Sequence, residues 1–298
     1  MTQFLNKIIP VIIIFLIGIF TRKIKLLQKK DADLLLKVVF YLTIPALTFI
    51  SVAKAELSLD FVYLPLISIT MIFIAYFSAK LISSQLELPA KTRGTFLVGS
   101  MIMNTGFTLP FVISAFGKPG VAVYTFFDFG NVLMIFTFVF YIAIRHGKNS
   151  KDKIDFRKFL KLPPLWGLLA GFIVNILNLE IPILIENFCD TIGLPTIFLM
   201  MLSLGIYFNP IPKNLKKISL VLFTRIGIGM LFGFLITILL NLEGIMRVIV
   251  IAGCGAPVGY NTLVFATLEN LDKEFAASIV SISILLGIIY VPILMLFL

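Results

Sequence analysis

Two stretches of this sequence decide its fold: residues 99–110 read GSMIMNTGFTLP, and residues 253–262 read GCGAPVGYNT. Each lies within a longer apolar segment, yet each combines glycine and proline with asparagine and threonine. Proline removes a backbone donor and clashes with the preceding helical turn, while glycine lowers the cost of leaving the helix. The two stretches therefore predict helices that are interrupted part-way.

Interrupted helices in a lipid environment have a specific chemical consequence. Unwound backbone exposes N–H and C=O groups that lipid cannot satisfy, so it persists only where protein or a cavity surrounds it. Two interruptions near mid-span predict half-helices that meet at the membrane centre, with N-termini that offer partial positive charge to an anion. A structural alternative is that Gly and Pro are common in membrane helices and that Asn and Thr only join helices. The candidate substrate-binding residues of the two stretches are Asn104, Thr105, Gly106, Pro110, Pro257, Gly259, Asn261 and Thr262.

The composition of the chain places it in a membrane. Of its 298 residues, 59% are hydrophobic and only 13% are charged, against about 45–50% and 25% in globular proteins. Ten spans of about 20 residues use roughly 200 residues and leave about nine for each loop or tail. This excludes a soluble hydrolase, a nucleic-acid-binding protein and an additional soluble domain. We predict an all-α membrane protein with ten transmembrane helices, in the apolar segments 4–20, 34–53, 61–83, 94–116, 121–144, 165–179, 184–208, 218–240, 245–268 and 275–298.

The net charge of +10 is distributed unevenly among the loops. Nineteen of the 25 Lys and Arg residues lie in the odd-numbered loops, and positive side chains near short loops stay on the cytoplasmic side. We therefore predict that both termini lie outside. The apolar N-terminal segment is interpreted as a retained first span, because no small-residue cleavage site follows it.

The longest polar stretch, residues 145–162, divides the chain into two halves of five spans each, residues 1–144 and 163–298. An odd number of spans gives the halves opposite orientations, which predicts a 5+5 inverted repeat. Pro45 of the second span lies near the counterpart of Pro195 in the seventh, at a shift of 150 residues. A shift of 154 residues pairs Arg93 with Arg247, Gly99 with Gly253, Thr108 with Thr262, Leu109 with Leu263 and Phe111 with Phe265.

Two ionisable residues, Asp128 and Arg225, lie deep within the fifth and eighth predicted spans. A charge at such depth is costly unless it is paired or faces water, so each is a candidate for function, with structural pairing as the alternative. We assign both as candidate coupling or ion-site residues. Asp128 would carry a proton or help to hold a cation, and Arg225 would contact the substrate.

Other chemistries lack the residues that they need. The chain has one histidine and two distant cysteines, which gives no zinc motif, no disulfide framework and no histidine-based catalytic triad. It also lacks a phosphate-binding glycine loop, so ATP-driven pumping would need another subunit. The sequence therefore predicts a secondary transporter that is not an enzyme and that uses no cofactor, with proton or sodium coupling possible.

The motifs of three spans resemble those of the auxin efflux carrier family. They are Asn104-Thr105-Gly106-Phe107 followed by Pro110 in the fourth span, Pro257-x-x-x-Asn261 followed by Ala266 in the ninth, and AASIV at residues 276–280 before Pro292 in the tenth. The resemblance covers essentially the whole chain, although only these spans are specific. One departure is that the family pattern has one more residue between the Asn and the Pro of the fourth span.

The resemblance implies a fold related to that of the bile acid sodium symporters. Helices one, two, six and seven would form a scaffold, and helices three to five with eight to ten a moving transport domain in which helices four and nine cross at their breaks. Family members often form homodimers, and bacterial members are associated with malate, malonate and related organic anions. The short central loop resembles that of the bacterial members, which places the chain in the bacterial inner membrane.

These observations predict a secondary transporter of small organic carboxylate anions, malate- or malonate-like or auxin-like, that works by elevator-type alternating access. The substrate carboxylate would lie on the half-helix N-termini near Asn104 and Asn261, with Thr43 and Pro45 of the second span lining the scaffold side. The expected partners are this small anion, membrane lipid and a second copy of the chain, with no nucleic acid. Two alternatives stay open: a sodium-coupled bile acid or steroid-type symporter, and a non-transporting membrane ligand sensor.

Overall fold

The structure, a computed structural model, describes residues 2–147, 162–208 and 214–297. Residues 148–161 of the predicted central loop, residues 145–162, lie outside the described residues. Within the described ranges the regular elements are helices, apart from one isolated bridge. They are α1 (Thr2–Lys23), α2 (Lys29–Val38), α3 (Ile44–Ala53), α4 (Tyr63–Ser84), α5 (Ala90–Met101), α6 (Thr105–Met134), α7 (Phe140–His146), α9 (Pro163–Ile176), α10 (Ile183–Gly193), α11 (Thr196–Tyr207), α12 (Leu215–Leu222), α13 (Ile228–Leu239), α14 (Gly244–Cys254), α15 (Asn261–Leu268) and α16 (Lys273–Phe297), with a short 3-10 helix η2 (Leu59–Val62) and the π-helical turns η1 (Val39–Thr43), η3 (Ile135–Val139) and η4 (Phe223–Gly227).

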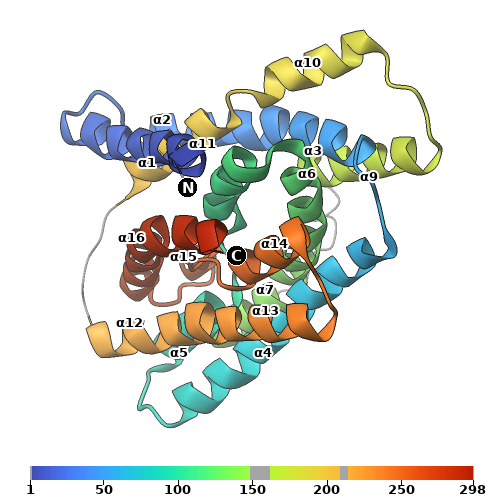
Figure 1. Cartoon of the computed structure of the whole chain (residues 1–298). Helices are drawn as coiled ribbons and strands as arrows, with labels where there is room; N and C mark the ends of the chain where they lie inside the picture. The colour runs from blue at the N-terminus through green and yellow to red at the C-terminus, as the bar shows by residue number, and fades with distance from the viewer. Residues whose placement is uncertain (1, 148–161, 209–213, 298) are drawn as a thin grey trace.

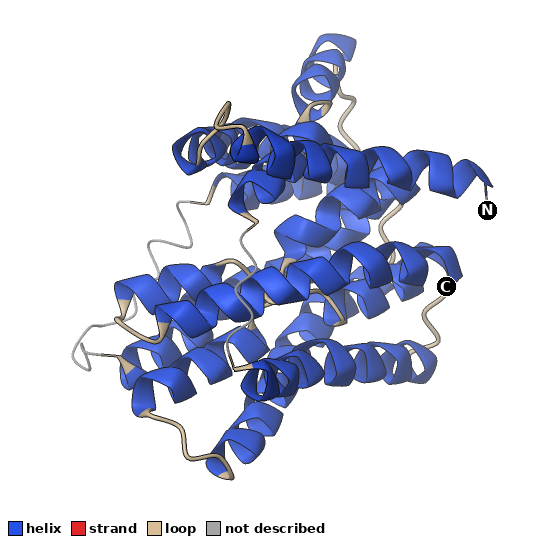
Figure 2. Cartoon of the chain, turned by 90° about the vertical axis from the view of Figure 1, so that its left-hand side faces the viewer, coloured by secondary structure: helices blue, strands red, loops and turns tan. Residues whose placement is uncertain are grey.

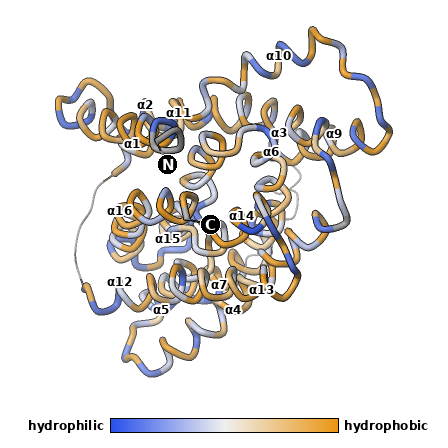
Figure 3. The backbone as a smooth tube through the Cα atoms, viewed as in Figure 1, coloured by the Kyte–Doolittle hydropathy of each residue, from blue (hydrophilic) through white to orange (hydrophobic). Residues whose placement is uncertain are grey.

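The longer helical stretches have the length and hydropathy of membrane spans. Figure 3 shows that they are predominantly hydrophobic along their length, with hydrophilic residues concentrated near their ends and in the loops. Helices satisfy their own backbone, which is required in lipid, so the prediction of an all-α membrane protein is confirmed. Six stretches of the described residues are long and apolar enough to cross a membrane: Lys29–Ala53, Asp60–Ser84, Thr105–His146, Ile183–Tyr207, Leu215–Leu239 and Lys273–Leu296; Pro163–Ile176 and Gly244–Cys254 are shorter apolar helices.

The helices form two groups with α6 between them (Figure 1). One group contains α1, α2, α3, α9, α10 and α11, and the other contains α4, α5 and α12 to α16. Within the first group, α1 packs on α11 and α3 packs on α9. The two helical parts of α6 meet at a kink at the non-helical Gly117 (φ 59°). Together they contact α3 and α11 on one side and α4 and α14 on the other, so α6 joins the two groups.

Loops that are far apart in the sequence are held together at one end of the helices. Arg22 at the end of α1 donates from Nη1 to the carbonyl oxygen of Phe208 at 2.7 Å, just beyond α11. Thr92 at the start of α5 donates from Oγ1 to Asp272 Oδ2 at 2.8 Å, just before α16. Each bond joins two of the odd-numbered loops, which carry the excess of positive charge.

Lysines of the even-numbered loops are instead paired with acids. Lys118 forms an ion pair with Asp190 of α10, with Nζ and Oδ2 2.7 Å apart. Lys54, which follows α3, forms an ion pair with Glu186, which is also in α10. The positive charges of these even-numbered loops are therefore neutralised where they occur.

The start of α1 and the end of α16 lie on the same side of the molecule (Figure 2).

The two prolines at corresponding places of the second and seventh spans act differently. The helix continues through Pro45 from Lys29 to Ala53, because the wider π-helical turn η1 ends two residues before the proline, which lies in the first turn of α3. At Pro195, by contrast, α10 has ended at Gly193 and α11 begins at the next residue. A proline in a membrane helix can thus be accommodated without a break.

Candidate functional site

The two glycine- and proline-rich stretches are non-helical in the structure. Helix α5 ends at Met101 and α6 begins at Thr105, which leaves residues 102–104 unwound. Helix α14 ends at Cys254 and α15 begins at Asn261, which leaves residues 255–260 unwound. Both gaps lie within the stretches for which the sequence predicts interrupted helices.

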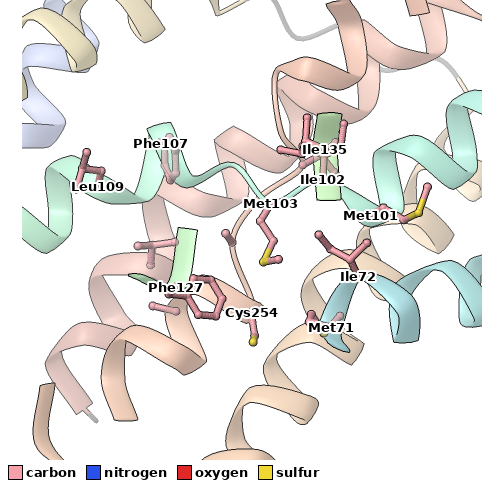
Figure 4. Close-up of a cluster of buried hydrophobic side chains, with 14 of the residues drawn as sticks. Met71, Ile72, Met101, Ile102, Met103, Phe107, Leu109, Phe127, Ile135 and Cys254 are labelled. Atoms are coloured by element: carbon pink, nitrogen blue, oxygen red, sulfur yellow. The ribbon is translucent and has the colours of Figure 1, made fainter. Parts of the chain in front are cut away.

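The two unwound segments lie side by side and bond to each other. Met103 and Val258 form an isolated antiparallel bridge. The Asn104 N–H donates to the Pro257 carbonyl at 2.9 Å, and the N–H of Gly259 donates to the Ile102 carbonyl at 2.9 Å. Figure 4 shows Met101, Ile102 and Met103 in this region, with Cys254 and the ring of Phe127 nearby. We call residues 102–104 and 255–260 the crossing.

Side chains of neighbouring helices complete the hydrogen bonding of the crossing. Buried backbone groups need partners, and lipid supplies none. Four side chains from neighbouring helices provide such partners and so make the irregular backbone stable in the interior of the bundle. Ser283 Oγ accepts from the Val258 N–H at 3.0 Å, and three side chains donate to carbonyls: Tyr290 Oη to Gly255 at 2.6 Å, Asn131 Nδ2 to Met103 at 3.4 Å and Arg225 Nε to Ala256 at 3.2 Å.

Asn104 holds the crossing together from both of its side-chain atoms. Its Oδ1 accepts from the Phe107 N–H at 3.1 Å and caps α6, and its Nδ2 donates to the Val258 carbonyl at 3.1 Å. The residue is 5% exposed and lines the cavity described below. The sequence predicts that Asn104 binds substrate, but the structure shows its amide engaged in holding α6 against the second segment.

We expect the main effect of Asn104→Ala to be a lower stability of the folded protein, with a smaller effect on its affinity for substrate. The change removes a helix cap, which is worth about 1 kcal/mol, and leaves the buried Val258 carbonyl without its donor, which costs about 1–3 kcal/mol more. The unfolding temperature of purified protein in detergent measures this. Asn261→Ala is the matched control, because Asn261 lines the same cavity and makes no side-chain hydrogen bond with the described residues. Equal unfolding temperatures for both variants would contradict this role of Asn104.

A cavity of about 380 Å³ opens beside the crossing. Six of the residues predicted for substrate or ion binding line it: Asn104, Thr105, Gly106, Asp128, Gly259 and Asn261. The rest of the lining is mostly aromatic and aliphatic, and includes Phe40, Tyr124, Phe129, Phe136, Leu165 and Tyr260. Pockets of about 300–1,000 Å³ with apolar walls and few polar groups are typical of small-molecule sites.

Two helix N-termini end at this cavity. Helix α6 begins at Thr105 and α15 at Asn261, and both residues are part of the wall. The first N–H groups of a helix have no acceptor within the helix, and the helix dipole places partial positive charge there. The N–H groups of Phe107, Thr262 and Leu263 have acceptors, whereas those of Thr105, Gly106 and Asn261 have none among the described residues. The site therefore presents these three donors and positive potential to a ligand, next to the Asn261 amide.

Asp128 is the charged residue among those that line the cavity. Asn131 donates from Nδ2 to its Oδ1 at 2.9 Å, and the same amide reaches the Met103 carbonyl of the crossing. Among the described residues no Lys or Arg forms an ion pair with Asp128. A carboxyl group without a counter-cation thus shares a cavity with two positive helix ends.

Two residues predicted on the second span do not line the cavity. Thr43 is buried and donates to the Val39 carbonyl at 3.3 Å, and the Pro45 carbonyl faces Gly167 of α9. The helix turns this face toward its neighbours, so the two residues are not part of the cavity wall, and their role on the scaffold side of a substrate site stays a prediction. Phe40, Ile44 and Thr48, spaced four residues apart on the next face, line the cavity instead.

Three further candidates lie next to the cavity without lining it. Pro110 is buried in α6, directly after the lining residue Leu109. Pro257 packs against Gly287 of α16, and Thr262 is fully buried, with a hydroxyl that has no hydrogen-bond partner among the described residues. These residues lie in or beside the half-helices and are not part of the cavity wall, and direct contact of any of them with substrate stays a prediction.

Arg225 also lies away from the cavity wall. It is 0% exposed, and all its hydrogen bonds go to backbone carbonyls near the crossing. Arg225 is therefore not part of the cavity wall in this structure, and its contact with substrate stays a prediction. A sequence alone gives the depth of a charged residue in a span, whereas the direction of its side chain depends on the local helix turn, here the π-helical turn η4.

Comparison with known proteins decides the family. A family model described as "Membrane transport protein" matches residues 3–295. The chain belongs to this membrane transport protein family. The resemblance to the auxin efflux carriers is thereby confirmed.

Relatives within the membrane transport protein family cover nearly the whole chain. An uncharacterized transporter of Methanocaldococcus jannaschii is 29% identical over 296 residues, which span 94% of both chains. An uncharacterized transporter of Methanothermobacter thermautotrophicus is 26% identical over 294 residues, which span 96% of both. The membrane transport protein described here is a transporter and not an enzyme.

Proposed function

We propose that this membrane transport protein is a secondary carrier of small organic carboxylate anions. The observation that carries the proposal is the convergence of the α6 and α15 N-termini on one cavity, next to Asn261. Partial positive charge and free N–H donors bind a carboxylate. The apolar remainder of the wall suits the carbon skeleton, and the volume of about 380 Å³ favours a small ligand.

We infer that the chain contains ten spans arranged as a 5+5 inverted repeat. In such a repeat the contact of the first span with the seventh corresponds to the contact of the sixth with the second. Both contacts exist, as α1 on α11 and α9 on α3. The antiparallel bridge between Met103 and Val258 further joins the two interrupted helices at corresponding points, as expected for opposite orientations.

The two helix groups of Figure 1 support an elevator-type mechanism. The first group would be the scaffold, and the second, with the crossing, would move as the transport domain. Placing the odd-numbered loops in the cytoplasm agrees with the positive charge that they carry. The cavity extends to Leu162 and Pro164 at the start of α9, which follows the central loop, so this orientation makes the described conformation inward-facing.

Charge balance in the cavity gives Asp128 a role in coupling. An ionised Asp128 and a substrate carboxylate would repel each other in a small site of low dielectric constant. Binding of the anion is therefore favoured when Asp128 carries a proton. The substrate and one proton would then cross together, which is the basis of proton coupling.

We expect Asn261→Ala to weaken substrate affinity while leaving the fold intact. The side chain of Asn261 makes no hydrogen bond with the described residues, so its loss leaves no protein group unsatisfied, whereas the loss of a hydrogen bond to a charged ligand costs about 1.5–3 kcal/mol. Uptake of radiolabelled malate, malonate and indole-3-acetate into proteoliposomes measures this. A raised KM with an unchanged unfolding temperature is the expected result.

The same assay separates transport from sensing. Saturable, gradient-dependent flux of a ligand identifies a carrier, whereas tight binding without flux identifies a ligand sensor. Unchanged KM and rate in Asn261→Ala, for a carboxylate that the native protein transports, would contradict the location of the substrate site. Sodium-dependent uptake of bile acids would favour the sodium symporter instead.

A further inference from the structure

The carbonyl ends of two half-helices converge on a single side chain. Helix α5 ends at Met101 and α14 ends at Cys254, and Arg225 of η4 lies between these ends. Its Nη1 donates to the Met101 carbonyl at 3.4 Å and to that of Ser100 at 3.5 Å. Its Nε donates to the Ala256 carbonyl at 3.2 Å, and its Nη2 to that of Cys254.

These carbonyls form an electronegative cage. The last carbonyls of a helix have no partner within the helix, and the helix dipole gives this end partial negative charge. Where helices are broken in a transporter, unwound carbonyls and half-helix C-terminal ends are the groups that coordinate a monovalent cation. The cage in this protein has that chemistry, and a guanidinium group fills it.

Within the part of the chain that the structure describes, the charge of Arg225 is balanced by these dipoles. The side chain is 0% exposed, and no carboxylate among the described residues forms an ion pair with it. A buried cation without a counter-anion is costly unless fixed dipoles replace its hydration. The carbonyls of α5 and α14 and the cation therefore depend on each other.

We propose that Arg225 is a tethered cation that takes the place of a monovalent metal ion at the crossing. As a positioning residue it holds the C-terminal ends of α5 and α14 together, and the crossing then forms without sodium. The consequence for coupling rests on the proposed transport function: uptake of substrate needs no sodium, and Asp128 is left as the carboxyl group in the cavity that carries the coupled proton.

The test uses the purified full-length chain in detergent, with buffers of equal ionic strength that contain sodium, potassium or choline chloride. The native protein is expected to unfold at the same temperature in all three. Arg225→Ala is expected to unfold at a lower temperature in choline and to recover when methylguanidinium or sodium is added, because the empty cage binds a small cation. Arg225→Met, which fills the space without charge, is expected to be destabilised without recovery.

Arg22→Ala is the matched control. Arg22 also donates to backbone carbonyls, those of Ile206 and Phe208 at 3.2 and 2.7 Å, but it is only half-buried. Water can therefore replace its bonds, and methylguanidinium is expected to leave this variant unchanged. Recovery of both variants to the same extent would show a general effect of the cation and would overturn the proposal.

Further results would also overturn it. The proposal fails if Arg225→Ala is as stable as the native protein in choline, or if no cation stabilises Arg225→Ala. It also fails if sodium stabilises the native protein relative to choline. If Arg225→Ala does not fold, Arg225→Lys is compared with Arg225→Met, and a lysine variant no more stable than the methionine variant contradicts the need for charge.

Proteoliposome uptake is expected to proceed in sodium-free buffer at the rate seen with sodium. Absence of carboxylate uptake under every condition would contradict the proposed function, while the unfolding temperatures would still decide the role of Arg225.

Discussion

Gly259→Ala is expected to abolish transport and to destabilise the folded protein by about 1–3 kcal/mol, the usual cost of overpacking. A Cβ atom at this position would clash with Cγ2 of Ile102 and would lie 3.2 Å from the Met103 carbonyl oxygen. The Gly259 N–H also donates to the Ile102 carbonyl across the crossing. The two segments would have to separate, and with them the helix ends that form the cavity.

Proteoliposome uptake and the unfolding temperature in detergent measure this effect. Gly106→Ala is the matched control: it adds the same methyl group to the same cavity wall, but its nearest neighbour would be Met200 Cε at 3.7 Å, an ordinary contact. The double variant Ile102→Ala with Gly259→Ala removes the closest clash and is expected to recover part of the stability. A Gly259→Ala protein that unfolds and transports like the Gly106→Ala protein would show that the close approach of the segments is unnecessary.

Asp128→Asn is expected to abolish accumulation of substrate driven by a pH gradient while preserving exchange of substrate between the two sides. Asparagine keeps an oxygen that accepts from Asn131, so the local bonding stays intact. It carries no titratable proton, so the site resembles the protonated state permanently. Substrate can bind and cross with the loaded carrier, but no proton moves with it, and uptake stops at equal concentrations on both sides.

Uptake into proteoliposomes with and without an imposed pH gradient measures the accumulation, and counterflow measures the exchange. Asp190→Asn serves as the control, because Asp190 pairs with Lys118 outside the cavity. The control is expected to accumulate substrate like the native protein. Undiminished pH-driven accumulation by Asp128→Asn would exclude the proposed coupling role.

Several features of the site follow from residue types and their places in the chain. Glycine and proline inside apolar segments indicate where both helices are interrupted, since a helix in lipid rarely leaves its regular form without them. Asn261 and Asp128 were found because polar groups at such depth are costly, and both line the cavity. The aromatic lining residues Tyr124 and Tyr260 were missed, although Tyr124 lies one helical turn from Asp128 and Tyr260 lies next to Gly259.

The roles of individual polar side chains were not predictable in the same way. The sequence predicts both Asn104 and Asn261 as substrate ligands, yet Asn104 caps α6 and bonds to Val258. Likewise, Arg225 is identified as a deep charge but not as the partner of carbonyls on two other helices. An amide or a guanidinium group bonds with whatever lies within reach, and that is decided by how helices distant in sequence pack.

A helical fold, a membrane location and two broken helices follow from the sequence, because hydropathy and backbone chemistry are properties of local segments. Only the tertiary structure decided that the breaks cross at Met103 and Val258, that Ile44 and Thr48 face the cavity instead of Thr43 and Pro45, and that Arg225 joins two helix ends. The physical reason is that hydrogen bonds and close contacts act over about 3–4 Å. The partners of Asn104 and Arg225 include Val258 and Met101, each more than 100 residues away in the chain, where no local pattern specifies them.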